Sequence, residues 1–172
     1  MSSNPSRIYT VFRVARAGVD PLSTLGSQAN GGRYNAPGMG VLYTSMSKAT
    51  AVAEVARGLR ARGVNPSNFG RGDWWAYEIR VSANRVMDLG EEVDRSSLGV
   101  TSEMLVAEDT TETRRIGKYA RDHGFDAIIA PSAAVSDNDN LVLFVDKLAI
   151  PPEVVSSTPV DLQALANQDI FR

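Results

Sequence analysis

The order of strand-forming and helix-forming segments is the sequence feature that most restricts the fold. Six segments are rich in the β-branched, aromatic and other apolar residues typical of strands, at residues 8–15, 41–44, 74–81, 85–89, 125–130 and 141–146. Two longer segments favour helix, 45–63 and 111–122, and a small third helix is expected at 161–168. The strands outnumber the helices and do not alternate with them in repeated βαβ units. We therefore predict an α+β fold rather than a doubly wound parallel sheet.

The two long helices have recognisable starts. Ser45 or Ser47 can accept a hydrogen bond from the first turn of the first helix, and Thr110 or Thr111 can do the same for the second. Residues 18–40 contain many Gly, Asn, Ser and Pro residues, so we expect them to be mostly loop.

The composition excludes several kinds of site. The 172 residues include no cysteine, which excludes disulfides, thiolate metal ligands and a cysteine nucleophile, and fits a reducing compartment. The single histidine, His123, excludes a histidine metal cluster, and its place at the end of a predicted helix is explained by the helix dipole rather than by catalysis. A net charge of −2 argues against general nucleic-acid binding.

No segment has the pattern of a secretion signal or of a membrane helix. Residues 1–6 are polar, and no apolar run approaches the ~20 residues that a membrane helix needs. We therefore expect a single domain over residues 1–172, located in the cytoplasm, that binds neither membranes nor nucleic acid directly. Residues 151–172 form a C-terminal tail to which the sequence assigns no function.

Four side chains could together form a nucleotide site, although they are far apart in the chain. Two glycines precede Arg33 and let the backbone approach a ligand, while Arg33 and Arg13 could share a pyrophosphate. Tyr43 offers an aromatic face for stacking, and the carboxylate of Glu54 could stabilise positive charge on a sugar. This set suits a dinucleotide whose glycosidic bond is cleaved, and no G-x-G-x-x-G or G-x-S-x-G motif indicates hydride transfer or esterase chemistry.

Each of these residues also has an ordinary structural interpretation. The Gly-Gly-Arg-Tyr-Asn segment is typical of a surface turn, and Glu54 could be solvated or paired with Arg57. Tyr43 could belong to the core, Ser132 could cap a turn or helix, and Arg13 could lie on a solvated strand face. None of these residues alone establishes a site.

The ordered set of motifs is more specific, and it resembles the RES domain, a family named for an arginine, a glutamate and a serine. The likeness spans roughly residues 8–148. The matching segments are Phe-Arg-Val at 12–14, Gly-Gly-Arg-Tyr-Asn at 31–35, Leu-Tyr-Thr-Ser at 42–45, Ala-Val-Ala-Glu at 51–54, Val-Met-Asp-Leu at 86–89, Asp-Ala-Ile-Ile-Ala-Pro-Ser-Ala at 126–133 and Asn-Leu-Val-Leu-Phe at 140–144. The chain departs from the family pattern at Tyr34, Ala130 and Ala134, and we expect these departures to affect the rim of the site.

The resemblance implies a fold similar to ADP-ribosyltransferases, in which small mixed or antiparallel β-sheets with flanking helices form a cleft for NAD⁺. It implies a bacterial toxin that depletes NAD⁺ by hydrolysis or phosphorolysis of the nicotinamide–ribose bond. An Xre-type antitoxin would neutralise the toxin by blocking the cleft. NAD⁺ is the substrate in this hypothesis, and no metal or other cofactor is expected.

Carried onto this sequence, the resemblance gives the cleft six residues, Arg13, Arg33, Tyr34, Tyr43, Glu54 and Ser132. We expect Arg33, Tyr43 and Glu54 to take part in catalysis. Arg13 and Arg33 would anchor the pyrophosphate or the neighbouring ribose, and Tyr43 would stack on nicotinamide. Glu54 would stabilise charge on the ribose or bind the ribose hydroxyls. Tyr34 would contact the substrate, and Ser132 would bind the substrate or orient Glu54.

Two other functions stay open at this point. The first is a mono-ADP-ribosyltransferase that modifies a protein acceptor, with loss of NAD⁺ as a side reaction. The second is a non-catalytic module that binds a nucleotide or a partner in the cleft. A structural or DNA-binding role is disfavoured by the negative charge.

Overall fold

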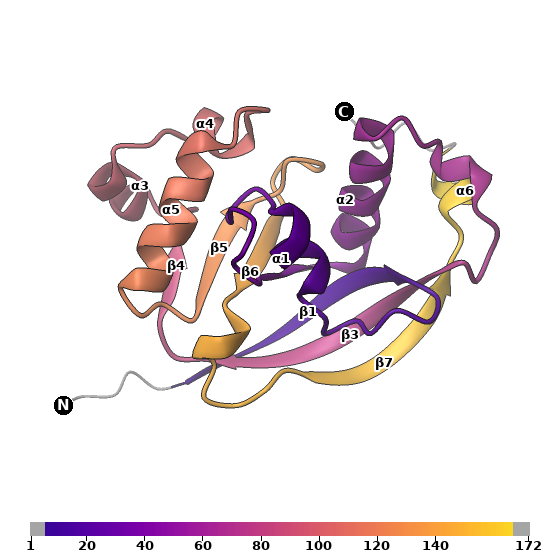
Figure 1. Cartoon of the computed structure of the whole chain (residues 1–172), viewed down its shortest axis with the longest axis horizontal. Coiled ribbons are helices and arrows are strands. Elements are labelled where there is room, and N and C mark those ends of the chain that lie inside the picture. Colours follow the sequence, from indigo (N-terminus) through magenta and orange to yellow (C-terminus); the bar gives the residue numbers. More distant parts are fainter. Residues whose placement is uncertain (1–5, 167–172) are drawn as a thin grey trace.

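The computed structural model describes residues 6–166, which form seven strands and six helices (Figure 1). The strands are β1 (Arg7–Arg16), β2 (Leu42–Ser45), β3 (Trp74–Ala83), β4 (Val86–Asp88), β5 (Ala127–Pro131), β6 (Asp139–Leu143) and β7 (Glu153–Val160). The helices are α1 (Leu25–Asn30), α2 (Lys48–Ala61), α3 (Glu92–Leu98), α4 (Ser102–Val106), α5 (Thr111–Asp122) and α6 (Leu162–Ala166). Two short 3-10 turns lie at Pro66–Asn68 and Val145–Lys147.

The seven strands of the described residues form one sheet in the order β4-β5-β6-β2-β1-β3-β7. Within it, β4 and β5 are parallel and the other neighbours are antiparallel. β1 pairs with β3 along its whole length, but it meets β2 at one pair, Phe12 with Ser45. The sheet therefore consists of two half-sheets, β1-β3-β7 and β4-β5-β6-β2, joined at a narrow junction. The α+β class with small mixed and antiparallel sheets is confirmed.

The two faces of the sheet are packed differently. Side chains alternate between faces along a strand. On one face, Val11 and Leu42 belong to a single buried cluster that continues across both half-sheets. On the other face the core is divided: α2 packs on β1 and β3 through Val52, while α5 packs on the other half-sheet through Ile116. Figure 1 shows α2 near β1 and α5 near β4 and β5. The division leaves space between the two helices, at the junction of the half-sheets.

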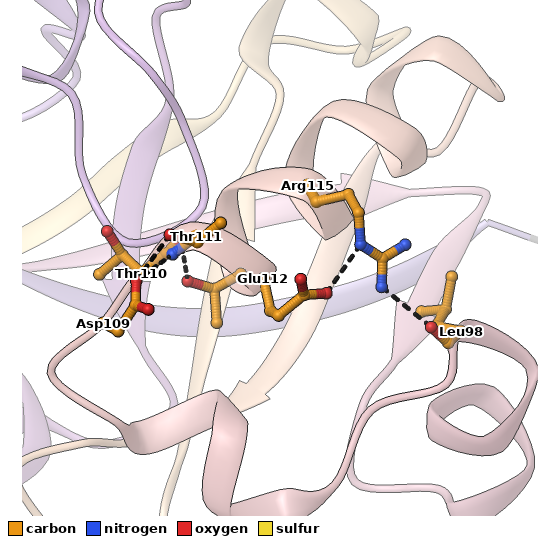
Figure 2. A network of polar contacts seen from close by, with 7 residues as sticks. Leu98, Asp109, Thr110, Thr111, Glu112 and Arg115 are labelled. Atoms are coloured by element: carbon orange, nitrogen blue, oxygen red, sulfur yellow. Dashed lines mark hydrogen bonds and ion pairs between the residues drawn. The ribbon is translucent and has the colours of Figure 1, made fainter.

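Both long helices are confirmed, with one difference in how they begin. The Oγ of Ser47 accepts a hydrogen bond from the backbone N–H of Thr50, so Ser47 caps α2 as predicted. Thr110 occupies the cap position of α5 but makes no side-chain cap bond. The carboxylate of Asp109 accepts hydrogen bonds from both the hydroxyl and the backbone N–H of Thr111 instead (Figure 2). These two bonds hold the pKa of Asp109 below its ordinary value.

Four elements are not predicted from the sequence. Residues 25–30, which lie within the predicted loop, form α1. The helices α3 and α4 and the strand β7 are also present in the structure but were not predicted. β7 is exposed along nearly its whole length and has no alternation of apolar and polar residues, because it lies at the edge of the sheet. The predicted C-terminal helix is present from Leu162, while residues 167–168 lie outside the described residues. No helix of residues 6–166 is long and apolar enough to span a membrane.

Candidate active site

A cleft of about 660 Å³ opens between α2 and the 31–35 loop, beside the junction of the half-sheets. Small-molecule sites typically have volumes of about 300–1,000 Å³. Five of the six predicted site residues line this cleft, namely Arg13, Arg33, Tyr34, Tyr43 and Glu54. The fold thus gathers side chains from β1, β2, α2 and one loop into a single cavity.

Glu54 projects from α2 into the cleft and is held by two hydrogen bonds. Its Oε1 accepts one from the hydroxyl of Ser132 and one from the side-chain amide of Asn140, each at 2.7 Å. The other carboxylate oxygen has no protein hydrogen-bond partner within residues 6–166. The alternative partner considered for Glu54, Arg57, donates to Glu108 instead.

Ser132 lies behind the wall of the cleft, where its side chain is buried. Its Oγ accepts hydrogen bonds from the backbone N–H groups of Ala134 and Val135, both at 3.1 Å. Those bonds direct the hydroxyl hydrogen toward Glu54. Of the two roles expected for Ser132, this geometry favours orientation of the carboxylate.

Asn140 is a site residue that the sequence analysis quoted within a strand motif but did not assign to the cleft. It lies on β6 directly opposite Ser45 of β2, whose hydroxyl donates to Asn140 Oδ1 at 2.7 Å. That bond fixes the orientation of the amide, so its nitrogen faces Glu54. Ser45, Asn140, Glu54 and Ser132 therefore form one continuous hydrogen-bonded chain.

Tyr43 connects the cleft to the glycine-rich loop. Its hydroxyl donates to Asn35 Oδ1 at 2.6 Å and accepts from the backbone N–H of Tyr34 at 2.8 Å. Burial raises the pKa of Tyr43 to about 12. A Cβ atom at Gly32 would lie 2.5 Å from this hydroxyl, which explains the glycine at this position. Asn35, a second residue that was not predicted, holds the loop by donating to the carbonyls of Ser27 and Met39.

Tyr34 is 2% exposed, and burial raises the pKa of its phenol. Nothing within residues 6–166 forms a hydrogen bond with its Oη. The expectation that Tyr34, Ala130 and Ala134 lie at the rim is wrong, because all three are buried and Ala130 belongs to the core under α5. Tyr34 is a wall residue with an unpaired hydroxyl.

Both predicted arginines bind loop carbonyls as well as lining the cleft. The Nη1 of Arg13 donates to the carbonyls of Pro21 and Ser23, each at 2.9 Å. The Nη1 of Arg33 donates to Leu105 at 3.3 Å and to Ala107 at 2.6 Å. Burial lowers the pKa of Arg13, and the nearby carboxylate of Asp20 partly opposes that effect. Each guanidinium keeps other N–H groups for a ligand.

Helix α5 supports the 31–35 loop from behind. The backbone of α5 approaches so closely that a Cβ atom at Gly117 would lie 1.7 Å from the carbonyl oxygen of Tyr34. Arg114, on the same helix, donates from Nε to the carbonyl of Gly32 at 3.0 Å. The positions of Arg33, Tyr34 and Tyr43 therefore depend on how α5 packs.

No group of three His, Cys, Asp or Glu side chains within residues 6–166 could hold a metal ion. His123 does not line the cleft; its ring stacks on Tyr119 at a centroid distance of 3.9 Å.

Similarity to known proteins identifies the family of this chain. The family model described as the RES domain matches residues 10–163. The chain belongs to the RES domain family. This RES domain is 37% identical over 142 residues to a Mycobacterium tuberculosis protein named "Probable NAD(+) phosphorylase". The match covers 77% of this chain and 64% of that protein, so the chain spans less than two thirds of its relative.

The fold of this RES domain is also found in a solved structure. A chain in the crystal structure of the M. tuberculosis MbcT–MbcA toxin–antitoxin complex superposes with a TM-score of 0.80 at 21% sequence identity. The superposition covers 94% of this RES domain and 88% of that chain. The family model reaches residue 163 and so includes β7, which pairs with β3.

Proposed function

We propose that this protein is a toxin that consumes NAD⁺ by breaking its nicotinamide–ribose bond. The observation that carries the proposal is the carboxylate of Glu54, fixed through one oxygen by Ser132 and Asn140 and directed into a cleft of nucleotide size. The aromatic side chain of Tyr43 and the guanidinium of Arg33 line the same cleft. An anchored anion beside an aromatic ring and an arginine suits a ligand that carries a cationic ring and phosphates.

The reaction follows from the charges involved. When the C–N bond breaks, its electron pair leaves with nicotinamide, which becomes neutral, and positive charge develops on the ribose. The carboxylate of Glu54 stabilises that charge, and its free oxygen can accept a hydrogen bond from a ribose hydroxyl. One such preorganised group contributes ~3–4 kcal/mol to transition-state stabilisation.

The other wall residues hold the substrate. The hydroxyl of Tyr43 is occupied by Tyr34 and Asn35, so the ring is fixed and can stack on nicotinamide. Tyr34 contributes to the wall of the cleft, and its backbone N–H helps to hold the Tyr43 ring. Arg13 and Arg33 bind the pyrophosphate through the N–H groups that the loop carbonyls leave free, and no metal or further cofactor takes part.

Inorganic phosphate is the acceptor that the name of the M. tuberculosis relative supports, and water is the alternative. An oxygen of HPO₄²⁻ forms the new bond to the ribose carbon as nicotinamide leaves, which gives ADP-ribose 1″-phosphate. The similar fold in a toxin–antitoxin complex supports an antitoxin as the partner. We propose an Xre-type antitoxin that blocks the cleft, and action in the cytoplasm, where NAD⁺ is available.

Purified protein incubated with NAD⁺, with and without phosphate, tests this proposal. We expect nicotinamide together with ADP-ribose 1″-phosphate or free ADP-ribose, and loss of nicotinamide release in the Glu54→Gln variant. Glu103→Gln, which changes an exposed carboxylate on α4, is the control and should keep full activity. Covalent ADP-ribose on a protein in place of free product would favour the transferase, and no consumption of NAD⁺ by folded wild-type protein would contradict cleavage altogether.

A further inference from the structure

Arg57 lines the cleft together with Glu54, which lies three residues earlier on α2. Residues three apart on a helix lie on neighbouring turns of one face. The Nη2 of Arg57 donates to the carboxylate of Glu108 at 2.6 Å, and Glu108 also lines the cleft. Their ion pair therefore connects α2 with the loop between α4 and α5.

That loop, residues 107–110, is held independently at both ends. Arg33 binds the carbonyls of Leu105 and Ala107 on one side of Glu108. On the other side, the carboxylate of Asp109 accepts hydrogen bonds from the hydroxyl and the backbone N–H of Thr111, the first residue of α5 (Figure 2). The loop thus does not need the Arg57–Glu108 pair to keep its position, and the pair calls for another explanation.

The Glu108 carboxylate is easily displaced. Its side chain is 90% exposed, and that of Arg57 is 33% exposed. Pairs between solvent-exposed charges contribute little, because water screens them and both side chains lose freedom. A phosphate group carries more charge and can take two parallel hydrogen bonds from one guanidinium. Arg57 can therefore exchange Glu108 for a phosphate without losing a contact that a loop needs. Arg13 and Arg33, in contrast, each use part of the guanidinium to hold loop carbonyls.

There is room for such a group beside Arg57. Gly58 follows it and lines the cleft; apart from its chain neighbours and the backbone of its own helix, no atom lies within 4 Å of the position that a Cβ would occupy. Arg62 lines the same cavity, and its guanidinium has no partner within residues 6–166. The α2 side of the cleft thus combines open space with two positive charges, of which Arg57 is paired with the exposed carboxylate of Glu108.

We propose that Arg57 binds a phosphate group in the cleft and that Glu108 is the counter-ion that this group displaces. The inference rests on the proposed cleavage of NAD⁺, since it adds a subsite to the same cleft. The phosphate belongs either to the pyrophosphate of NAD⁺ or to inorganic phosphate that acts as acceptor. The backbones of Arg57 and Glu54 are three residues apart on α2, ~4.5 Å along the helix axis.

Steady-state kinetics of two opposite variants test the subsite. Arg57→Gln should raise the KM for the phosphate-bearing ligand about tenfold or more, equivalent to ~1.4 kcal/mol. Glu108→Gln should lower the same KM a few-fold, because Arg57 is then free. If the ion pair serves only to support the loop, both variants change the KM in the same direction, which would overturn the proposal. Arg115→Gln is the control, since it removes a similar exposed pair with Glu112, on α5 and away from the cleft lining (Figure 2).

The two sources of phosphate give different results. A rise in KM confined to inorganic phosphate, with the product shifting from ADP-ribose 1″-phosphate to ADP-ribose, identifies the acceptor. A rise confined to NAD⁺, with an unchanged product ratio, identifies the pyrophosphate. Unchanged values for both ligands in folded Arg57→Gln protein refute the subsite.

A binding measurement separates this inference from the proposed function. ADP-ribose is titrated calorimetrically into wild-type and Arg57→Gln protein, and again in the presence of inorganic phosphate. If wild-type protein releases no nicotinamide but Arg57→Gln still weakens either ligand, the cleavage proposal fails and the subsite stands. Equal binding of both ligands to the two proteins removes the subsite whatever the activity.

Discussion

At the scale of single residues, the direction in which Glu54 points depends on two donors that bind the same oxygen. Ser132→Ala removes one of them and leaves Asn140 in place. A hydrogen bond to a charged group contributes ~1.5–3 kcal/mol, so we expect kcat for nicotinamide release to fall about tenfold or more. The KM for NAD⁺ should change little, because Ser132 does not line the cleft.

Ser136→Ala is the matched control for this prediction. Ser136 follows Ser132 by four residues, and its buried hydroxyl has no partner within residues 6–166. Its removal should leave kcat unchanged. An equal loss of kcat in both variants would mean that any serine in this segment affects folding, and that Ser132 has no special role in orienting the carboxylate.

The phenol of Tyr43 should titrate late. Burial raises its pKa from 10.0 to about 12, which means that the folded state holds the proton more tightly than the unfolded chain. The stability that this provides is complete below pH 10 and is lost as the pH rises through 12. The ultraviolet absorbance of tyrosinate should therefore show late titration of both Tyr34 and Tyr43, and Tyr43→Phe should remove one of these two late-titrating groups. Titration of all the tyrosines below pH 11 in folded protein would contradict the burial of this hydroxyl.

The sequence identifies residues of the site better than it identifies their partners. Arg33, Tyr43 and Glu54 belong to local motifs that can be recognised before the fold is known. Asn140 could not be assigned in the same way, because its partner Ser45 is set by the register of β2 against β6. A shift of one residue in that register would turn the amide to the opposite face of the sheet.

At the scale of elements, the contact between α5 and the 31–35 loop requires a residue without a side chain at Gly117. In Gly117→Ala the new Cβ would lie 1.7 Å from a backbone carbonyl, so the helix and loop must separate. Overpacking of this kind typically costs ~1–3 kcal/mol. We expect a lower free energy of unfolding in urea, together with weaker NAD⁺ cleavage, because the loop carries Arg33 and Tyr34.

Gly58→Ala is the corresponding control on α2. It is also a glycine-to-alanine change within a helix, but the added Cβ meets no atom within 4 Å beyond its chain neighbours and the backbone of its own helix. Replacing an interior helical glycine by alanine typically stabilises a protein by ~0.5–1 kcal/mol. The two variants should therefore shift the urea midpoint in opposite directions. A Gly117→Ala protein as stable as Gly58→Ala would show that α5 does not press on the loop.

The elements that could be predicted are those whose pattern is local. α2 and α5 are long, and both begin at cap positions that the sequence shows. α3 and α4 are short helices that bury few residues, and β7 exists as a strand because β3 pairs with it. Tertiary pairing determines that strand, so a reading of the segment alone leaves it out.

At the scale of the whole molecule, the site lies where the two half-sheets separate. The buried cluster around Val11 and Leu42 joins them on one face, whereas on the other face α2 and α5 pack on different half-sheets. Glu54 is part of α2, and Tyr34 is part of the 31–35 loop, against which α5 packs. A ligand in the cleft therefore connects two parts of the core that the protein itself leaves apart on this face.

Hydrogen exchange of the inactive Glu54→Gln variant can detect this connection. NAD⁺ at ~100 times its Kd stabilises the bound state by ~2.7 kcal/mol against any opening that releases the ligand. Separation of α2 from the 31–35 loop is such an opening. The slowly exchanging backbone amides of both half-sheets should therefore gain protection together. These amides lie in β1 and β3 of one half-sheet and in β5 and β6 of the other. The comparison is with the same variant without NAD⁺. Added protection in one half-sheet alone would place the ligand on one wall of the cleft and would contradict a site assembled from both.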